Sequence, residues 1–190
     1  MMKNNITIKG QTLTLRLVKL EDAKFILKLR TDEGLNRFIH KGSINLESQT
    51  EWIRKYLEKE NDYYFVIETN LDKKPVGVIS IYDIKDNHAE WGRWILLKGN
   101  NFAIESVYLI YKVAFEIIKL EYIFCRTVED NKSVVSFHKS CGLKENKILK
   151  NHFCLEGFYY NAVEHTLDHD QWNTVNKKLE KLSFLISKKK

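Results

Sequence analysis

Hydrophobic and polar residues alternate along residues 12–18, which is the period of a strand that buries one face. Later runs rich in β-branched and aromatic residues predict strands at 63–69, 75–84, 88–97 and 122–128. Two final strands, at about 148–155 and 158–167, are joined through Glu156 and Gly157, which form a short hairpin signal. The pattern therefore predicts seven strands, and the three in the middle of the chain are consecutive and antiparallel.

Hydrophobic residues at helical spacing lie between these strands. A first helix follows Glu21 and Asp22, and its apolar residues are Ala23, Ile26, Leu27 and Leu29. A second helix is expected to begin at Asn45, because asparagine is a good N-cap residue. We expect this helix to pack four residues inward, namely Trp52, Ile53, Tyr56 and Leu57.

Three further helices are predicted in the second half of the chain. A long apolar helix runs from Ala103 to about residue 119. The helix 131–141 is followed by Gly142, at the position that a left-handed C-cap prefers. A last helix begins at about Asp170 and is expected to place Leu179, Leu182 and Leu185 on one face. Strands and helices mix along the chain without an internal repeat or linker, so we predict a single domain, 1–190, of the α/β (α+β) class.

Composition agrees with one domain that has its own core, because 44% of the 190 residues are hydrophobic. No apolar run approaches the roughly 20 residues of a membrane helix, and the N-terminus carries no signal-like segment. The three cysteines, Cys125, Cys141 and Cys154, have no metal-ligand spacing. We therefore expect a cytoplasmic protein with reduced, mostly buried thiols and no metal site.

The net charge of +6 is concentrated at the C-terminus, at about 170–190, where six lysines follow one another closely: Lys177, Lys178, Lys181, Lys188, Lys189 and Lys190. Such a tail contacts nucleic acid or anionic lipid, or it only keeps a surface helix soluble. We favour the second interpretation. Aromatic residues do not alternate with lysine or arginine along any predicted strand, so no nucleic-acid partner is expected.

Residues 90–106 contain the chain's clearest chemical signal. A strand ends in a short polar turn with Gly99 and two asparagines, and an apolar helix begins at once. Unpaired backbone N–H groups and the positive end of the helix dipole then point at one spot. Such a spot binds phosphate or pyrophosphate.

In this order, three stretches resemble the GCN5-related N-acetyltransferase superfamily (GNAT). They are residues 14–22, residues 90–106, and Asn131-Lys-Ser-Val-Val-Ser-Phe-His-Lys-Ser-Cys-Gly-Leu143. The resemblance extends from Leu13 to about Trp172, and the last stretch also resembles the branch of ribosomal-protein and amino-sugar acetyltransferases. It implies a central, mixed, mostly antiparallel twisted sheet of about seven strands flanked by helices. It also implies acetyl-CoA as the acetyl donor.

Thirteen residues would contact coenzyme A if the resemblance holds. They are Ile95, Leu96, Leu97, Lys98, Gly99, Asn100, Asn101, Phe102, Ala103, Ile104, Asn131, Ser133 and Phe137. A backbone N–H within 95–97 would hold the thioester oxygen, and residues 98–103 would hold the pyrophosphate. Lys98 stands where the family has Arg or Gln, and Asn101 stands at the central glycine, a position that asparagine can fill by adopting left-handed backbone.

Three side chains are candidates for proton transfer. Glu90 is the preferred base, with a pKa raised by Trp91 and Trp94, and its alternative role is an ordinary hydrogen bond at a strand end. His40 is the second candidate base, or a loop residue without function. His138 occupies the position of the family's tyrosine acid. With a pKa near neutral it would protonate the thiolate, or it is a spacer beside the cofactor.

The sequence thus predicts an acetyl-CoA-dependent N-acetyltransferase for a small amine. A nucleotide-linked amino sugar is our first hypothesis, because residues 136–142 resemble the amino-sugar branch and because Arg37, Lys41 and Arg93 are expected near the acceptor entrance. The alternatives are a protein acetyltransferase and a non-catalytic acyl-CoA-binding module. The final hairpin and last helix leave both a monomer and a homodimer open.

Overall fold

The structure is a computed structural model that describes residues 6–40, 42 and 45–188. Its strands are β1 (Thr7–Lys9), β2 (Leu13–Leu17), β3 (Tyr63–Thr69), β4 (Pro75–Lys85), β5 (His88–Leu96), β6 (Tyr122–Val128), β7 (Lys144–Leu155) and β8 (Phe158–Asp168). Its helices are α1 (Ala23–Thr31), α2 (Leu46–Leu57), α3 (Ala103–Lys112), α4 (Lys132–Ser140) and α5 (His169–Ser187). Lys41, Lys189 and Lys190 lie outside the described residues.

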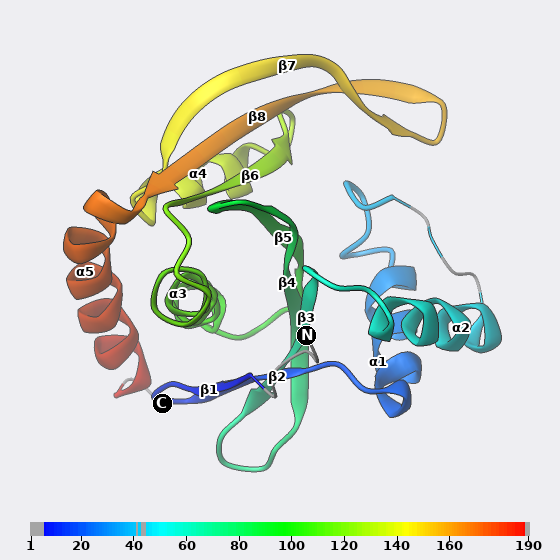
Figure 1. Ribbon diagram of the computed structural model, residues 1–190. Helices are drawn as coiled ribbons and strands as arrows, with labels where there is room; N and C mark the ends of the chain where they lie inside the picture. The colour runs from blue at the N-terminus through cyan, green and yellow to red at the C-terminus, as the bar shows by residue number, and fades with distance from the viewer. Residues whose placement is uncertain (1–5, 41, 43–44, 189–190) are drawn as a thin grey trace.

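The described strands form one eight-stranded sheet in the order β1-β2-β3-β4-β5-β6-β8-β7, with every pair antiparallel except β5 and β6. Helices α1 and α2 cover one side of the sheet and α3 and α5 the other (Figure 1). The predicted fold class is confirmed. The prediction of about seven strands missed β1, because three residues are too short to show a period.

The parallel strands β5 and β6 pair over only three residues each, from His88 with Tyr122 to Glu90 with Phe124. Beyond that point β5 stays with β4 and is bulged, since Ser80 pairs with Gly92 but Val78 pairs with Ile95. Arg93, within the bulge, has φ of 46°. A bulge bends and twists its strand, so β5 departs from β6 just after Glu90.

Each side of the sheet has its own hydrophobic core. The larger core, under α3 and α5, includes Trp91, Tyr111 and Trp172, and the smaller core, under α1 and α2, includes Ile53 and Tyr56. Every core side chain named here is at least 97% buried. The central strands therefore bury both faces, which explains why they read as nearly continuous apolar runs.

Helix α2 begins as predicted, because the Asn45 side chain accepts a hydrogen bond from the Ser48 N–H at 2.9 Å. The expected inward face was wrong in part. Trp52 is 39% exposed and Leu57 is 41% exposed, and the buried residues of α2 are Gln49, Ile53 and Tyr56. The helix contacts the sheet along a narrow stripe, and Trp52 lies beside it, stacked on Tyr56 with ring centroids 5.6 Å apart.

The predicted leucine face of α5 was also wrong in part. The buried residues are Trp172, Val175, Leu179 and Ser183, whereas Leu185 is 46% exposed. Successive steps of three residues drift around a helix of 3.6 residues per turn, so 179, 182 and 185 cannot share one narrow face. Two turn predictions were confirmed: Gly142 has φ of 95°, and Glu156 and Gly157 have φ of 52° and 84°.

Candidate active site

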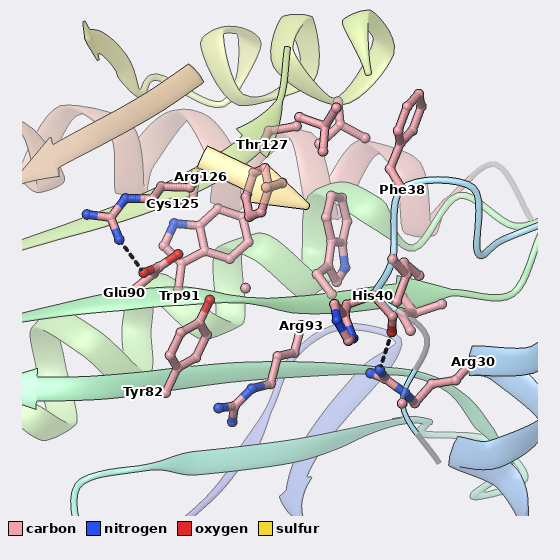
Figure 2. Close-up of a pocket in the computed structure, with 18 of the residues that line it drawn as sticks. Arg30, Phe38, His40, Tyr82, Glu90, Trp91, Arg93, Cys125, Arg126 and Thr127 are labelled. Carbon is pink, nitrogen blue, oxygen red and sulfur yellow. Dashed lines mark hydrogen bonds and ion pairs between the residues drawn. The ribbon is translucent and has the colours of Figure 1, made fainter. Parts of the chain in front are cut away.

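A cavity of about 520 Å³ opens where β5 leaves β6. Its lining comes from α1, the loop after α1, α2, strands β3 to β7 and α4 (Figure 2). Of the sequence-predicted site residues, it brings together Glu90, His40, His138, Ile95 and Asn131. The remaining predicted cofactor residues do not line it.

Glu90 is 9% exposed and is held by groups from two neighbouring strands. The Arg126 guanidinium lies 3.0 Å from its carboxylate (Figure 2), and hydrogen bonding by the Tyr82 hydroxyl helps to hold the pKa of Glu90 down. Gly92 leaves the space that Tyr82 occupies, since a Cβ there would lie 2.9 Å from the hydroxyl oxygen. Burial raises the pKa of Glu90 and the Arg126 charge opposes that rise, so the predicted direction of the pKa shift is confirmed.

Arg126 also pairs with Glu164, at 3.0 Å, so it bridges two carboxylates. Burial alone would raise the pKa of Glu164, but hydrogen bonds from Asn146 and Arg126 outweigh it and the pKa is lowered. Sequence reasoning missed Arg126, Tyr82 and Glu164. Arg126 and Glu164 stood out only as charged residues inside a strand and Tyr82 did not stand out at all, so the pattern could not connect any of them to Glu90.

His138 lies on α4 and is 3% exposed. Its ring meets Trp91 edge-on, with centroids 5.1 Å apart. Burial lowers the pKa of His138 to about 3, so the expectation of a near-neutral pKa was wrong. The imidazole is neutral at physiological pH, so it offers one N–H donor and one acceptor nitrogen.

The loop after α1 brings His40 to the cavity. Its backbone carbonyl accepts a hydrogen bond from the Arg30 guanidinium at 2.8 Å (Figure 2). The His40 side chain itself is exposed. Gly42 also lies against Arg30, because a Cβ there would be 2.9 Å from Nη2. Arg30 therefore organises this loop, a role that the sequence did not predict.

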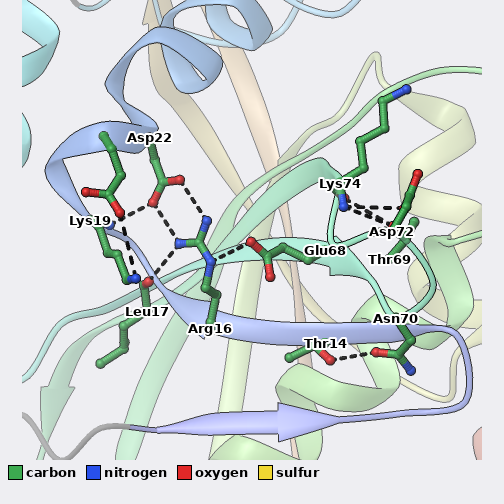
Figure 3. Close-up of polar contacts among 11 residues, drawn as sticks. Thr14, Arg16, Leu17, Lys19, Asp22, Glu68, Thr69, Asn70, Asp72 and Lys74 are labelled. Atoms are coloured by element: carbon green, nitrogen blue, oxygen red, sulfur yellow. Dashed lines mark hydrogen bonds and ion pairs between the residues drawn. The ribbon is translucent and has the colours of Figure 1, made fainter.

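Helix α1, which carries Arg30, is fixed at its start by Arg16 of β2 (Figure 3). The guanidinium makes two 2.8 Å hydrogen bonds to Asp22 and one of 2.6 Å to Glu68 of β3. Asp22 also accepts the Lys19 N–H at 2.7 Å. Such a bidentate arrangement sets direction as well as distance, so the sheet determines where α1 places Arg30.

The polar turn between β5 and α3 differs from its predicted form. Gly99 takes the left-handed conformation, with φ of 80°, and Asn101 does not. The Asn100 side chain braces the turn by donating to the Leu97 carbonyl and accepting the Phe102 N–H at 3.1 Å. Helix α3 begins directly after this turn, and the first N–H groups of a helix have no partner within the helix itself. Lys98 Nζ lies beside Gly34 on the loop after α1.

The backbone N–H groups at 95–97, one of which was predicted to hold a thioester oxygen, differ in direction. The Leu97 N–H donates to the Val76 carbonyl of β4 at 2.9 Å. Amides alternate in direction along a strand, so the Ile95 N–H also points towards β4 and the Leu96 N–H points towards β6. Of the three predicted positions, only Leu96 directs its N–H into the opening.

Asn131 occupies the N-cap position of α4 but makes no side-chain cap hydrogen bond. Its Oδ1 accepts from the Ser133 hydroxyl at 3.1 Å, and the residue lines the cavity. Phe137 stacks on Trp94 with centroids 5.2 Å apart. Asn131 is therefore turned to the opening, whereas Ser133 and Phe137 support its wall.

Residues 12–144 match the family model "Acetyltransferase (GNAT) domain". The chain belongs to the GNAT family. It is 27% identical over 150 residues to "Acetyltransferase PseH" of Campylobacter jejuni, an alignment that covers 76% of this chain and 87% of that protein. It is 22% identical over 155 residues to a spermidine N(1)-acetyltransferase of Vibrio cholerae, covering 79% and 89%.

Among solved structures, the GNAT chain resembles FdhC, described as a nucleotide-linked sugar GNAT, with a TM-score of 0.76 and 30% identity over 92% of this chain and 96% of FdhC. A spermidine N-acetyltransferase structure from Vibrio cholerae matches with a TM-score of 0.76 and 22% identity, over 85% of this chain and 96% of that one. Within the described residues, no helix is long and apolar enough to span a membrane.

Proposed function

We propose that this GNAT protein transfers acetyl from acetyl-CoA to the amine of a nucleotide-linked amino sugar. The observation that carries the proposal is the charge of the cavity. Three arginines line it, Arg30, Arg93 and Arg126, and Glu90 is the one carboxylate among its described lining residues. An anionic acceptor fits such a lining, because opposite charge favours both encounter and binding.

Two of the three arginines are already neutralised. Arg93 pairs with Asp62 at 2.9 Å, and Arg126 pairs with Glu90 and Glu164. Arg30 has no carboxylate partner within the described residues, and its recorded hydrogen bond goes to a carbonyl. A guanidinium without a carboxylate partner suits a phosphate group, because it carries the opposite charge and presents its N–H donors in one plane. The resemblance to FdhC supports the same acceptor class.

The residues also fit acetyl-CoA. The N–H groups at the start of α3 suit the pyrophosphate, and the open edge of β5 offers the Leu96 N–H to the thioester oxygen. Asn131 faces the same opening. We assign Glu90 to accept the amine proton, directly or through water, because burial raises its pKa above that of an ordinary glutamate. His138 is assigned to donate its N–H to the departing sulfur.

Acetylation of a defined panel tests the acceptor class. We expect purified protein and acetyl-CoA to acetylate UDP- or dTDP-linked amino-deoxyhexoses, detected as a mass gain of one acetyl group. Arg30→Gln should raise KM for the nucleotide sugar and leave KM for acetyl-CoA unchanged. Arg37, which was expected near the acceptor entrance, does not line the cavity. It is exposed on the following loop and faces the Phe38 ring, so Arg37→Gln is the matched control.

Preferred acetylation of spermidine, or of a peptide N-terminus, would contradict the proposal. A polyamine would have to enter a cavity that carries more arginine than carboxylate, so we expect its kcat/KM to be the lower one. Equal losses in Arg30→Gln and Arg37→Gln would also contradict the role given to Arg30.

A further inference from the structure

Two buried polar side chains line the cavity and have no role in the proposed reaction. They are Gln49 of α2 and Tyr64 of β3, and each is 2% exposed. Within the described residues, neither the Gln49 amide nor the Tyr64 hydroxyl makes a hydrogen bond, and neither is sealed from the cavity. Because buried polar groups in native proteins have hydrogen-bond partners, both groups are available to something that enters the cavity.

Helices α1 and α2 direct four side chains to the part of the cavity that contains these groups. On α1, Ile26 and Arg30 are four residues apart, and on α2, Gln49 and Trp52 are three apart, so each pair shares one face of its helix. Trp52 meets the Tyr64 ring edge-on, with centroids 5.8 Å apart. We call this part of the cavity, lined by these five residues, the α1–α2 lobe.

The α1–α2 lobe is positively charged. Burial raises the pKa of Tyr64 to about 12, and the charges of Arg30 and Arg93 oppose that rise. The Tyr64 hydroxyl therefore stays protonated at physiological pH and can donate. The Arg93 guanidinium lies over the Trp52 ring at 5.9 Å. Arg30 gives one N–H to the His40 carbonyl, so its other N–H groups remain for a ligand.

This set of donors suits a phosphate group. A guanidinium, a hydroxyl and an amide NH₂ can all donate to phosphate oxygens, which only accept. The lobe contains no carboxylate among its described residues, so an ammonium group would find no partner of opposite charge there. Glu90, the assigned base, lies away from Arg30 in the cavity (Figure 2). The amine and the phosphate of one acceptor would then occupy different parts of the cavity.

We propose that Gln49 and Tyr64 complete, together with Arg30, a subsite for a phosphate of the acceptor. This assignment rests on the proposed function and adds two specificity-determining residues to it. The subsite selects an amino sugar that is linked to a diphosphate over the same sugar without phosphate. No bond is made or broken in the subsite, which acts only by binding.

Binding of UDP tests the subsite without an acceptor amine. The protein is first saturated with acetyl-CoA, so that the UDP phosphates cannot occupy the proposed pyrophosphate site at α3. In calorimetry, UDP should then bind at least roughly 100-fold more tightly than uridine, because hydrogen bonds between charged groups are the stronger ones. Tyr64→Phe and Gln49→Met should each weaken UDP binding roughly 10-fold. Equal affinities for UDP and uridine, or unchanged UDP affinity in both variants, would overturn the inference.

Tyr111→Phe is the matched control for Tyr64→Phe. The Tyr111 hydroxyl is also buried without a partner, but it lies on α3 and does not line the cavity, so its removal should leave UDP binding unchanged. Gln49→Glu tests the sign of the charge. It should weaken UDP binding more than Gln49→Met does, because a carboxylate repels phosphate. Tighter binding of spermidine than of UDP by the unaltered protein would overturn the inference.

Kinetics separate this inference from the proposed function. With a nucleotide-linked amino sugar, Tyr64→Phe and Gln49→Met should raise KM and leave kcat unchanged. With the same sugar lacking phosphate, kcat/KM should be low and equal in the variants and the unaltered protein. Equal kcat/KM for the two acceptors would overturn the phosphate subsite but not acetyl transfer. An unacetylated acceptor panel, with UDP still bound through Gln49 and Tyr64, would contradict the proposed function and leave the subsite standing.

Discussion

Glu90 owes its candidacy as a base to its neighbours rather than to its position at the start of a strand. Burial raises the pKa of Glu90, and the charge of Arg126 limits that rise. Glu90→Gln should therefore lower kcat by about 10²- to 10⁴-fold, the usual contribution of a positioned base. Acetyl-CoA binding, measured by calorimetry, should not change.

Glu164→Gln is the control for Glu90→Gln, because Glu164 shares Arg126 but does not line the cavity. Its loss of kcat should be much smaller. Full activity in Glu90→Gln would show that another group, with His40 the next candidate, accepts the proton.

The Arg126 charge should be visible in the pH profile of kcat/KM. A base works only when deprotonated, so activity falls as the pH drops through the pKa of Glu90. The Arg126 cation lowers that pKa against the effect of burial. Arg126→Met removes the cation, so the pKa of Glu90 rises and the acidic limb should move to higher pH. Arg126→Lys should keep the acidic limb near its original position. An unchanged limb in Arg126→Met would show that the limb does not report the ionisation of Glu90.

At the scale of elements, the turn between β5 and α3 depends on Asn100 rather than on Asn101. Asn100 makes two hydrogen bonds across the turn, and the exposed Asn101 keeps ordinary backbone geometry. With about 1 kcal/mol for each hydrogen bond, Asn100→Ala should weaken acetyl-CoA binding roughly 10- to 30-fold by calorimetry. Asn101→Ala, one residue away, should change the dissociation constant little. A larger effect of Asn101→Ala than of Asn100→Ala would show that Asn101, as first predicted, shapes the turn.

The elements were predictable wherever a local pattern determines them. Strands β3 and β6 have the predicted bounds, and Gly142 and the Glu156–Gly157 turn have the predicted conformations. The site was predictable only in part. Glu90 and His138 do line one cavity, but Arg126 reaches it through a pairing across the sheet and Arg30 through its contact with a folded loop. Contacts of that kind leave no periodic trace in a single sequence.

At the scale of the molecule, the opening between β5 and β6 interrupts one sheet that carries a core on each face. One core packs α1 and α2 on the sheet and the other packs α3 and α5. The cavity draws its walls from both sides of the opening, with Ile95 on β5 and Val128 on β6. A ligand that lies in this opening contacts both strands beyond the three residue pairs over which β5 and β6 are hydrogen-bonded. Binding should therefore stabilise the whole fold.

Acetyl-CoA should raise the melting temperature in proportion to its affinity. At one hundred times its dissociation constant, a ligand adds about 2.7 kcal/mol. For a chain of 190 residues, that free energy corresponds to a shift of roughly 5–11 °C. S-acetyl-pantetheine, which lacks the pyrophosphate, should give a smaller shift at equal concentration, because no phosphate then contacts the N–H groups at the α3 N-terminus. Equal shifts would show that the turn between β5 and α3 does not bind the pyrophosphate. No shift with millimolar acetyl-CoA would indicate that the protein does not use this donor.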